Sequence, residues 1–303
     1  MLEPVVEETP EPEIPLIPAP VDPTPDPIVP EPLPEPPTVA IALSSRQPAY
    51  EAVARELSNL LEEYAIYDLS DRSQPPVTAF RLINDSDAGV VVAIGLRAAR
   101  SSIAMSDTPV VFSQVFNYHE HELLSENSRG VSSLAPLTAH VAAWKDFDPN
   151  ITKIGAIIGE GHDELIAEAL EAAERHEVQL EIQVVTSDQE ALYHFRRMVR
   201  DIDGFWLFPD NRILSARSLN AILEQANQRR VPVAVTHEPL LTLGASLSVS
   251  AVAEDIAQTI VNVVREIEAG QIESVPLITP LSEARIVIGD AAENTRTASV
   301  SDE

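Results

Sequence analysis

Residues 38–69 read TVAIALSSRQPAYEAVARELSNLLEEYAIYDL, and this stretch decides the fold class. Its opening, TVAIAL (38–43), is apolar throughout and predicts a strand buried on both faces. Residues 48–64 predict a helix, because a proline stands in the first turn and apolar residues such as Val53 and Leu57 recur on one face. Residues 65–69 predict a second strand, so the stretch has the strand–helix–strand order of parallel pairing.

The same alternation of strand and helix continues to residue 288. Further strands are predicted at 89–94 and 109–115, and an irregular segment follows at 116–133. A second series begins at Lys153 and contains strands at 153–158, 179–185, 203–208 and 231–235. Because the series restarts, we expect an α/β fold of two Rossmann-like lobes, each with a parallel sheet covered by helices on both faces.

The first 38 residues have a different composition from the rest of the chain. They hold 14 of the 25 prolines and nine acidic residues, with no Lys or Arg. Proline removes backbone donors and like charges repel, so residues 1–38 are expected to be a disordered, extended Pro/Glu-rich spacer. No signal peptide opens the chain, and we expect an export signal or membrane anchor to have preceded the spacer.

Composition excludes several function classes. Residues 39–303 carry 39 acidic and 20 basic residues, a balance that repels nucleic acids and anionic membranes. No apolar run is long enough to span a bilayer, and there is no cysteine for disulfides or thiolate chemistry.

Enzymatic and metal motifs are weak. Gly159-Glu160-Gly161 lacks the full glycine fingerprint of a phosphate loop, and Glu160 would repel a phosphate. The run at 119–122 (HEHE) has no third metal ligand at a recognised spacing and is interpreted as a solvated loop. No GxSxG or HExxH motif occurs. The sequence therefore predicts no enzyme, no catalytic or metal-ligating residue and no cofactor.

Polar and aromatic residues follow the predicted strand ends, where open α/β sheets bind ligands. A candidate ligand-binding set comes from these loops: Ser45, Arg46, Tyr50, Gly95, Phe116, Asn117, Asp210, Asn211 and Glu238. Alternatives stay open, because Phe116 is apolar enough for a core, Arg46 fits a surface charge, and Asp210 or Asn211 fits a helix cap.

The order and spacing of these strands, helices and loops resemble the type I periplasmic binding fold. More narrowly, they resemble the ABC-transporter substrate-binding family that includes tryptophan/tyrosine-type binding proteins. The resemblance covers about residues 39–288. It is carried by AIALSSRQPAYEAV (40–53), VVVAIGLRAA (90–99), TPVVFSQV (108–115), DPNITKIGAII (148–158), DGFWLFPDN (203–211), RRVPVAVTHEPLLTLGA (229–245) and VPLITPLSEARIVI (275–288).

The resemblance implies two lobes joined by crossing segments at a hinge. The first would comprise 39–116 plus 240–273 and the second 117–239 plus 274–290, followed by a disordered tail at 291–303. It implies a receptor in the periplasm or cell envelope that closes on a small organic ligand, amino-acid-like or aromatic. It also implies an ABC permease as a partner. The same resemblance points to most of the candidate ligand-binding residues.

Two positions depart from the family pattern. Leu96 stands where such proteins usually have a small hydroxyl residue, and Phe116-Asn117-Tyr118 replaces a Thr-Asp-Pro-like stretch. These departures leave the ligand class open. The alternative function is a tethered envelope sensor or protein-interaction module that kept the binding-protein fold without transport.

Overall fold

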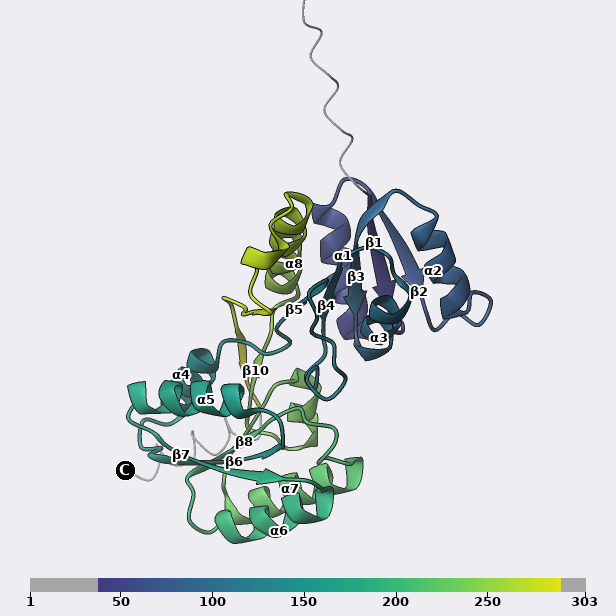
Figure 1. Ribbon diagram of the computed structural model, residues 1–303. Helices are drawn as coiled ribbons and strands as arrows, with labels where there is room; N and C mark the ends of the chain where they lie inside the picture. Colours follow the sequence, from purple (N-terminus) through teal and green to yellow (C-terminus); the bar gives the residue numbers. More distant parts are fainter. Residues whose placement is uncertain (1–37, 290–303) are drawn as a thin grey trace, which may run out of the picture. The chain divides into compact units, whose positions relative to one another are not determined.

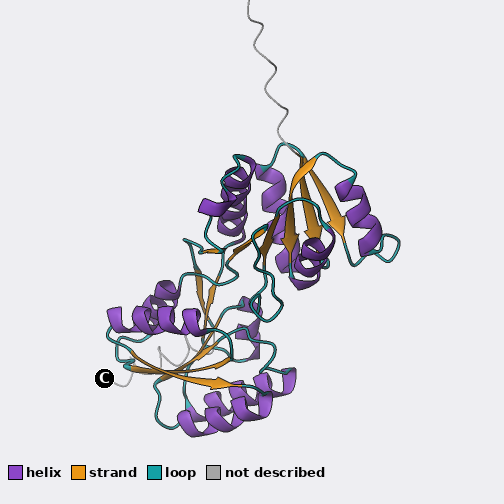
Figure 2. Ribbon diagram, in the orientation of Figure 1, coloured by secondary structure: helices purple, strands orange, loops and turns teal. Residues whose placement is uncertain are grey.

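The computed structural model describes residues 38–289, and these contain two six-stranded sheets (Figures 1 and 2). The predicted spacer, apart from Thr38, and the predicted tail lie outside the described residues. We call each sheet with its covering helices a lobe.

The first lobe contains the predicted strand–helix–strand opening. Its strands are β1 (Thr38–Leu43), β2 (Tyr64–Asp68), β3 (Ala88–Ile94), β4 (Val110–Ser113), β5 (Ser128–Val131) and β11 (Ile278–Thr279). Its helices are α1 (Pro48–Leu60), α2 (Pro76–Asn84), α3 (Leu96–Met105) and α8 (Ala253–Glu268), with a short 3-10 helix at Ile272–Ser274. All strand pairs of this sheet are parallel.

The second lobe repeats the plan. Its strands are β6 (Lys153–Gly159), β7 (Gln179–Val185), β8 (Gly204–Leu207), β9 (Val233–Val235), β10 (Leu247–Ser250) and β12 (Arg285–Ile288). Its helices are α4 (Leu137–Phe147), α5 (Asp163–Arg175), α6 (Asp188–Met198) and α7 (Ala216–Arg229), with a 3-10 helix at Glu238–Leu243. Only the pair β10 and β12 is antiparallel among the described strands of this sheet.

The two sheets have corresponding strand orders. The first runs β2-β1-β3-β4-β5-β11, and the second runs β7-β6-β8-β9-β10-β12. In each sheet the chain reverses its direction of winding between the first strand and the third, which is the topological switch point where open α/β sheets bind ligands. The switch points therefore lie between β1 and β3 in one lobe and between β6 and β8 in the other.

Each sheet is buried on both faces, which explains why its strands are apolar without alternation. In the first lobe α1 and α8 cover one face and α2 and α3 the other. In the second lobe α4 and α5 cover one face and α6 and α7 the other. Leu57 of α1 is fully buried, and burial of a leucine side chain stabilises a fold by about 1.5–3 kcal/mol.

Three connections cross between the lobes, after β5, after β10 and after β11. The last is anchored by Asp255 in the first turn of α8. Its carboxylate accepts hydrogen bonds from the backbone N–H groups of Ser282 and Glu283 at 2.8 and 2.9 Å. The buried carboxylate thereby ties this crossing segment to the start of α8.

The predicted lobe boundaries need correction at three strands. β5 lies in the first sheet although the sequence assigns 117–239 to the second lobe. β10 lies in the second sheet and β11 in the first, although the sequence assigns 240–273 to the first lobe and 274–290 to the second. The residues of β5, SRGV, are not strong strand formers, so pairing with β4 and β11 decides their conformation. Helix α2, which the sequence analysis missed, is only nine residues long.

Candidate ligand-binding site

A close-packed turn forms the rim of the first lobe at its switch point. Ser44 follows β1, and its Oγ accepts a hydrogen bond of 2.8 Å from the backbone N–H of Ala98 in the first turn of α3. Gly95 precedes that helix with φ +86° and ψ 165°, a conformation open essentially only to glycine. A Cβ at Gly95 would lie 2.7 Å from both Ser44 Oγ and the ring of Tyr50. The glycine thus lets Tyr50 lie against the turn.

A buried ion pair forms the rim of the second lobe at its own switch point. Asp210 follows β8 and is fully buried. Its Oδ2 accepts hydrogen bonds from the backbone N–H of Gly159 at 2.9 Å and from Arg212 Nη2 at 2.8 Å, and its Oδ1 accepts from Arg212 Nε at 3.0 Å. Burial alone would raise the pKa of Asp210, but its hydrogen bonds and the charge of Arg212 hold that pKa below its usual value.

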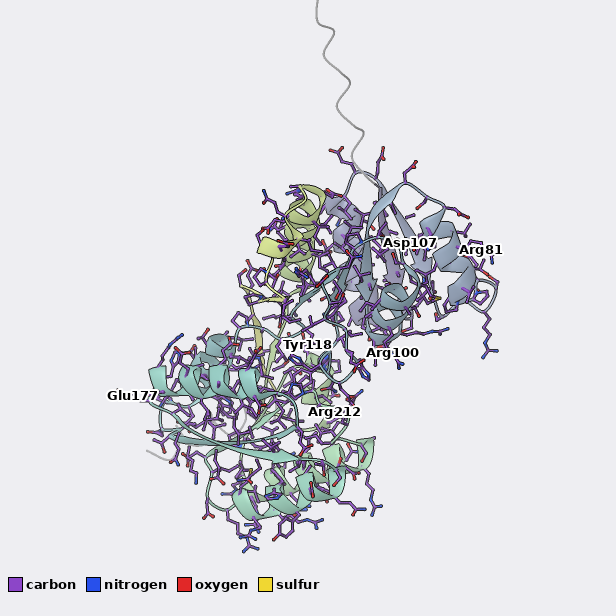
Figure 3. All side chains as sticks on the ribbon, in the orientation of Figure 1. Arg81, Arg100, Asp107, Tyr118, Glu177 and Arg212 are labelled. Atoms are coloured by element: carbon purple, nitrogen blue, oxygen red, sulfur yellow. The ribbon has the colours of Figure 1, made fainter. Side chains whose placement is uncertain are left out.

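The loop after β4 joins the two rims through Asn117. Its Nδ2 donates to Asp210 Oδ1 at 3.2 Å and to Asn211 Oδ1 at 3.0 Å, and its Oδ1 lies 3.0 Å from Nε2 of His162. Arg212, labelled in Figure 3, also reaches this loop, because its Nε lies 3.5 Å from Glu120 Oε2. Polar contacts therefore connect a loop of the first sheet to the strand ends of the second.

His162 is buried against the ring of Phe116, with ring centroids 4.6 Å apart. Burial lowers the pKa of His162, an effect that nearby Asp210 opposes and Arg212 reinforces. Burial thereby favours the neutral form of the imidazole, whose Nε2 lies against Asn117 Oδ1.

A cavity of about 340 Å³ lies among these strand ends, and we call it the interlobe cavity. Its walls come from the ends of β1, β3 and β4 in the first lobe and of β8 and β9 in the second, together with one crossing residue. They consist of Gln47, Ala49, Tyr50, Leu96, Gln114, Val115, Phe116, Asn117, His121, Ser133, Pro209, Asn211 and His237. Aromatic rings with a few placed amides are typical of small-molecule sites.

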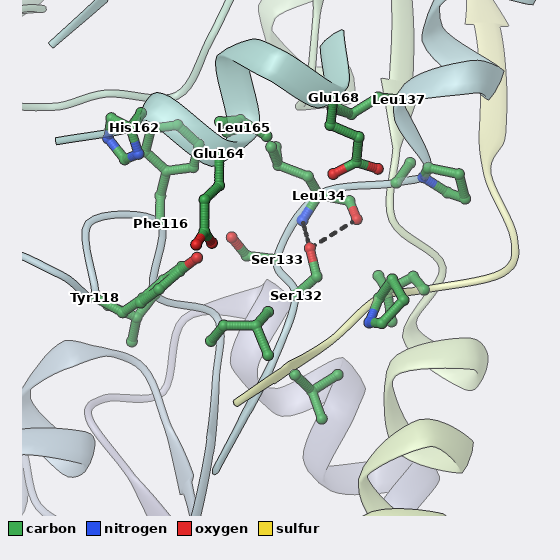
Figure 4. Close-up of a pocket in the computed structure, with 17 residues that line it drawn as sticks. Phe116, Tyr118, Ser132, Ser133, Leu134, Leu137, His162, Glu164, Leu165 and Glu168 are labelled. Atoms are coloured by element: carbon green, nitrogen blue, oxygen red, sulfur yellow. Dashed lines mark hydrogen bonds between the residues drawn. The ribbon is translucent and has the colours of Figure 1, made fainter. Parts of the chain in front are cut away.

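A second cavity of about 290 Å³ shares Val115, Phe116 and Ser133 with the first (Figure 4). We call it the acidic cavity, because Glu164 and Glu168 line it from one face of α5. Figure 4 shows Tyr118 pointing toward Glu164. Burial and the charges of both glutamates raise the pKa of the Tyr118 hydroxyl. This cavity suits a cationic group rather than an anionic one.

The structure separates the nine predicted ligand-binding residues into two groups. Tyr50, Phe116, Asn117 and Asn211 line the interlobe cavity. Five do not: Ser45 and Gly95 lie in the connections after β1 and β3, Asp210 is buried, and Arg46 and Glu238 lie on the surface. Their role as ligand contacts stays a prediction.

The charged residues that were predicted to contact the ligand all pair with charged residues of the protein itself. Arg46 Nε lies 3.0 Å from Asp68 Oδ2, and Glu238 Oε2 lies 3.4 Å from Arg285 Nε. Asp210 is not the cap of the following helix, since Ser215 caps α7 by accepting from the backbone N–H of Ser218.

The candidate set left out several lining residues. Gln47, Gln114 and His237 lie in the same strand-end loops as the candidates, so strand-end position points to them equally. His121 was interpreted as part of a solvated loop, but it lines the interlobe cavity. Among residues 38–289, no group of three or more His, Asp or Glu side chains is placed to hold a metal ion.

Comparison with known proteins identifies the family. The model of a family described as ABC transporter substrate binding protein matches residues 63–296, well over half of the chain. The chain belongs to this family. The resemblance noted from the sequence is thereby confirmed. None of the curated proteins compared with this binding protein matches it.

Solved structures confirm the fold. A conserved domain protein from Vibrio cholerae has 21% identity and a TM-score of 0.56, with 85% of this chain and 93% of that chain covered. An ABC domain in complex with L-Trp from Streptococcus pneumonia has 18% identity and a TM-score of 0.58, covering 86% and 94%. The ligand-free, open structure of a substrate binding protein with adhesive properties from Clostridium difficile has 16% identity and a TM-score of 0.62, covering 85% and 93%.

These likenesses confirm the two-lobed α/β fold of the periplasmic binding type. In the part of the chain that the structure describes, every helix is too short or too polar to cross a lipid bilayer.

Proposed function

We propose that this binding protein is the solute receptor of an ABC-type uptake system and binds a small organic ligand in the interlobe cavity. One observation carries the proposal. The strand ends of both sheets contribute side chains to a single cavity of about 340 Å³, walled by aromatic and carboxamide groups. A similar protein, an ABC domain solved in complex with L-Trp, supports a ligand about as large as an amino acid.

We propose hinge closure as the mechanism. A ligand held by Tyr50 of the first lobe gains contacts from Asn211 of the second when the lobes approach, and it stabilises the closed form only through that difference in affinity. An ABC permease would recognise the closed form, and the protein would act in the periplasm or cell envelope.

Binding rather than catalysis fits the chemistry of the titratable groups. His162 Nε2 and Asp210 Oδ2 lie 3.7 Å apart, but both side chains are more than nine-tenths buried. Asp210 already bonds Gly159 and Arg212, and His162 bonds Asn117. Groups occupied in this way suit a structural role better than proton transfer to a substrate.

A thermal-shift screen of the full chain over amino acids, nucleobases, sugars and short peptides tests the proposal. A solute at 100 times its dissociation constant should add about 2.7 kcal/mol of stability. Tyr50→Ala should remove that gain, while the control Tyr193→Ala, an exposed tyrosine on α6, should keep it. If no solute stabilises the chain, the interaction-module alternative replaces the receptor.

Hinge closure has a separate test, because the chain has no cysteine of its own. Cysteines introduced at Arg81 on α2 and Arg196 on α6 place one spin label on each lobe, both at exposed positions. The distance between the labels should change when ligand is added. An unchanged distance with bound ligand would contradict closure and leave binding intact.

A further inference from the structure

The interlobe cavity is uncharged in its lining. Of the described residues that form its walls, none is Asp, Glu, Lys or Arg. Its polar groups are four carboxamides, two imidazoles and two hydroxyls, from Gln47, Gln114, Asn117, Asn211, His121, His237, Tyr50 and Ser133. A charged ligand would therefore meet dipoles and no opposite charge on these walls.

The charged groups that follow the same strand ends are already neutralised. Arg46 is paired with Asp68, Asp210 with Arg212, and Glu238 with Arg285. To bind a ligand carboxylate or ammonium, the protein would first have to break one of these pairs. Removing a charge from water without a new partner is costly, so a zwitterion would be a poor fit here.

A carboxamide side chain can form a pair of hydrogen bonds with another amide group. A free carboxamide offers an N–H donor and a carbonyl acceptor side by side, which matches the amide edge of a ligand. Asn117 is not free in this sense, because its Nδ2 and Oδ1 already bond Asp210, Asn211 and His162.

Gln47 and Gln114 line the cavity from the first lobe, as Tyr50 does. Asn211 lines it from the second lobe, where its Oδ1 already accepts from Asn117. In the first turn of α1, Pro48 has no N–H and the N–H of Glu51 donates to Gln47 O, so the N–H groups of Ala49 and Tyr50 are the ones that can serve a ligand carbonyl.

Aromatic walls favour a flat ligand. Tyr50 and Phe116 line the cavity together with Leu96, an apolar residue at the start of α3. Rings stack on planar surfaces with a gain beyond simple area burial. The carboxylates Glu164 and Glu168 belong to the adjoining acidic cavity, so a cationic ligand would be drawn there instead.

Resting on the proposed receptor function, we infer that the ligand of the interlobe cavity is an uncharged planar ring compound with a carboxamide or lactam edge. The juxtaposition of amides and rings from both lobes selects this class over amino acids, organic acids and amines.

Matched probe pairs test the inference by calorimetric titration of the full chain. Nicotinamide is compared with nicotinate, and indole-3-acetamide with indole-3-acetate, tryptamine and tryptophan, at pH 8 where an unperturbed histidine is neutral. The amide of each pair should bind about tenfold tighter than the acid or more, because the acid buries an unpaired charge. A tighter acid, amine or amino acid overturns the inference.

A charge placed in the cavity sharpens the test. Gln47→Arg adds a cation at the wall and should shift preference toward nicotinate and indole-3-acetate. The control Gln258→Arg adds the same charge on an exposed position of α8 and should leave the preference unchanged. If both variants leave it unchanged, the probes bind elsewhere and the inference fails.

Failure of the inference and failure of the proposed function give different results. If amino acids or sugars bind and every amide fails, the receptor function stands and the inferred class of planar ring compounds with an amide edge is wrong. If no solute binds in either experiment, both are wrong.

Discussion

The two switch points of this binding protein correspond in topology and differ in chemistry. At the first, the Gly95 turn leaves Tyr50 and Leu96 facing the interlobe cavity. At the second, the protein's own ion pair of Asp210 and Arg212 occupies the strand ends. Side chains of the first rim can therefore contact a ligand. The charged side chains of the second rim bond each other, and Asp210 also accepts a hydrogen bond from Asn117. Corresponding topology therefore sets where a site can form, and individual side chains decide whether it stays free.

Asp210→Ala should give the largest effect and test whether the second rim is structural. Removal of the carboxylate leaves the buried N–H of Gly159 without its partner and Arg212 with only the longer contact to Glu120, and the loss should be about 3–5 kcal/mol. Urea denaturation measures it. The control Asp203→Ala removes an exposed carboxylate of the same lobe that accepts from Thr152 N, Thr152 Oγ1 and Lys153 N. Because water can replace these exposed partners, the total loss should be smaller than for Asp210→Ala.

Normal stability together with lost solute affinity in Asp210→Ala would contradict a structural role for the second rim. Asp210 would then be a ligand contact, and the second rim would bind the ligand.

Acid should act mainly on the second lobe, where the described buried histidines lie. Burial lowers the pKa of His140, which stacks on Trp206, to about 3. An unfolded histidine has a pKa of about 6.5, so the unfolded state binds one more proton between these values. The stability from neutral His140 is complete above about pH 6.5 and is lost as pH falls toward about 3.

His140→Phe should remove this dependence, which amounts to about 1.4 kcal/mol per pH unit. As the pH falls from about 6.5 to 4.5, the free energy of unfolding of the wild-type protein should therefore decrease relative to that of His140→Phe. Urea denaturation of both proteins at several pH values measures this difference. Parallel curves would show that His140 takes up its proton in the folded state.

Gly95→Ala tests the first rim against a matched glycine. The new Cβ would press on Tyr50 and Ser44, and the backbone would be strained, so a loss of about 1–3 kcal/mol is expected together with weaker solute binding. Gly161→Ala has a similar φ of +85°, but its Cβ would meet nothing within 4 Å. The difference between the two variants isolates the contact with Tyr50. Equal effects would mean that this contact does not shape the cavity.

Arg46→Ala should give the smallest effect. The side chain is 61% exposed and paired with Asp68, and exposed pairs stabilise proteins by less than about 1 kcal/mol. Solute affinity should be unchanged, because Arg46 does not line the interlobe cavity. A strong loss of affinity would restore the role that the sequence predicted for it.

The fold was predictable because its signals are local. Apolar runs such as 38–43 and 153–158 and the one-sided helices between them specify strands buried on both faces, and the restart near Lys153 indicates two sheets. The strand SRGV carries no such signal. It is a strand because β4 and β11 pair with it from distant positions in the chain, so the lobe boundaries could not be read from the sequence.

The two-lobed class and the loops in which a site can form follow from local sequence patterns, because periodicity predicts where strands end. Which residues of those loops are available to a ligand depends on contacts made in the folded protein. Asp210 and Arg46 are charged and follow strand ends, but each is paired with another charged residue of the protein. Tyr50 and Asn211 line the cavity. Such pairings join residues distant in sequence or settle the direction of a side chain, and neither is encoded in a local pattern.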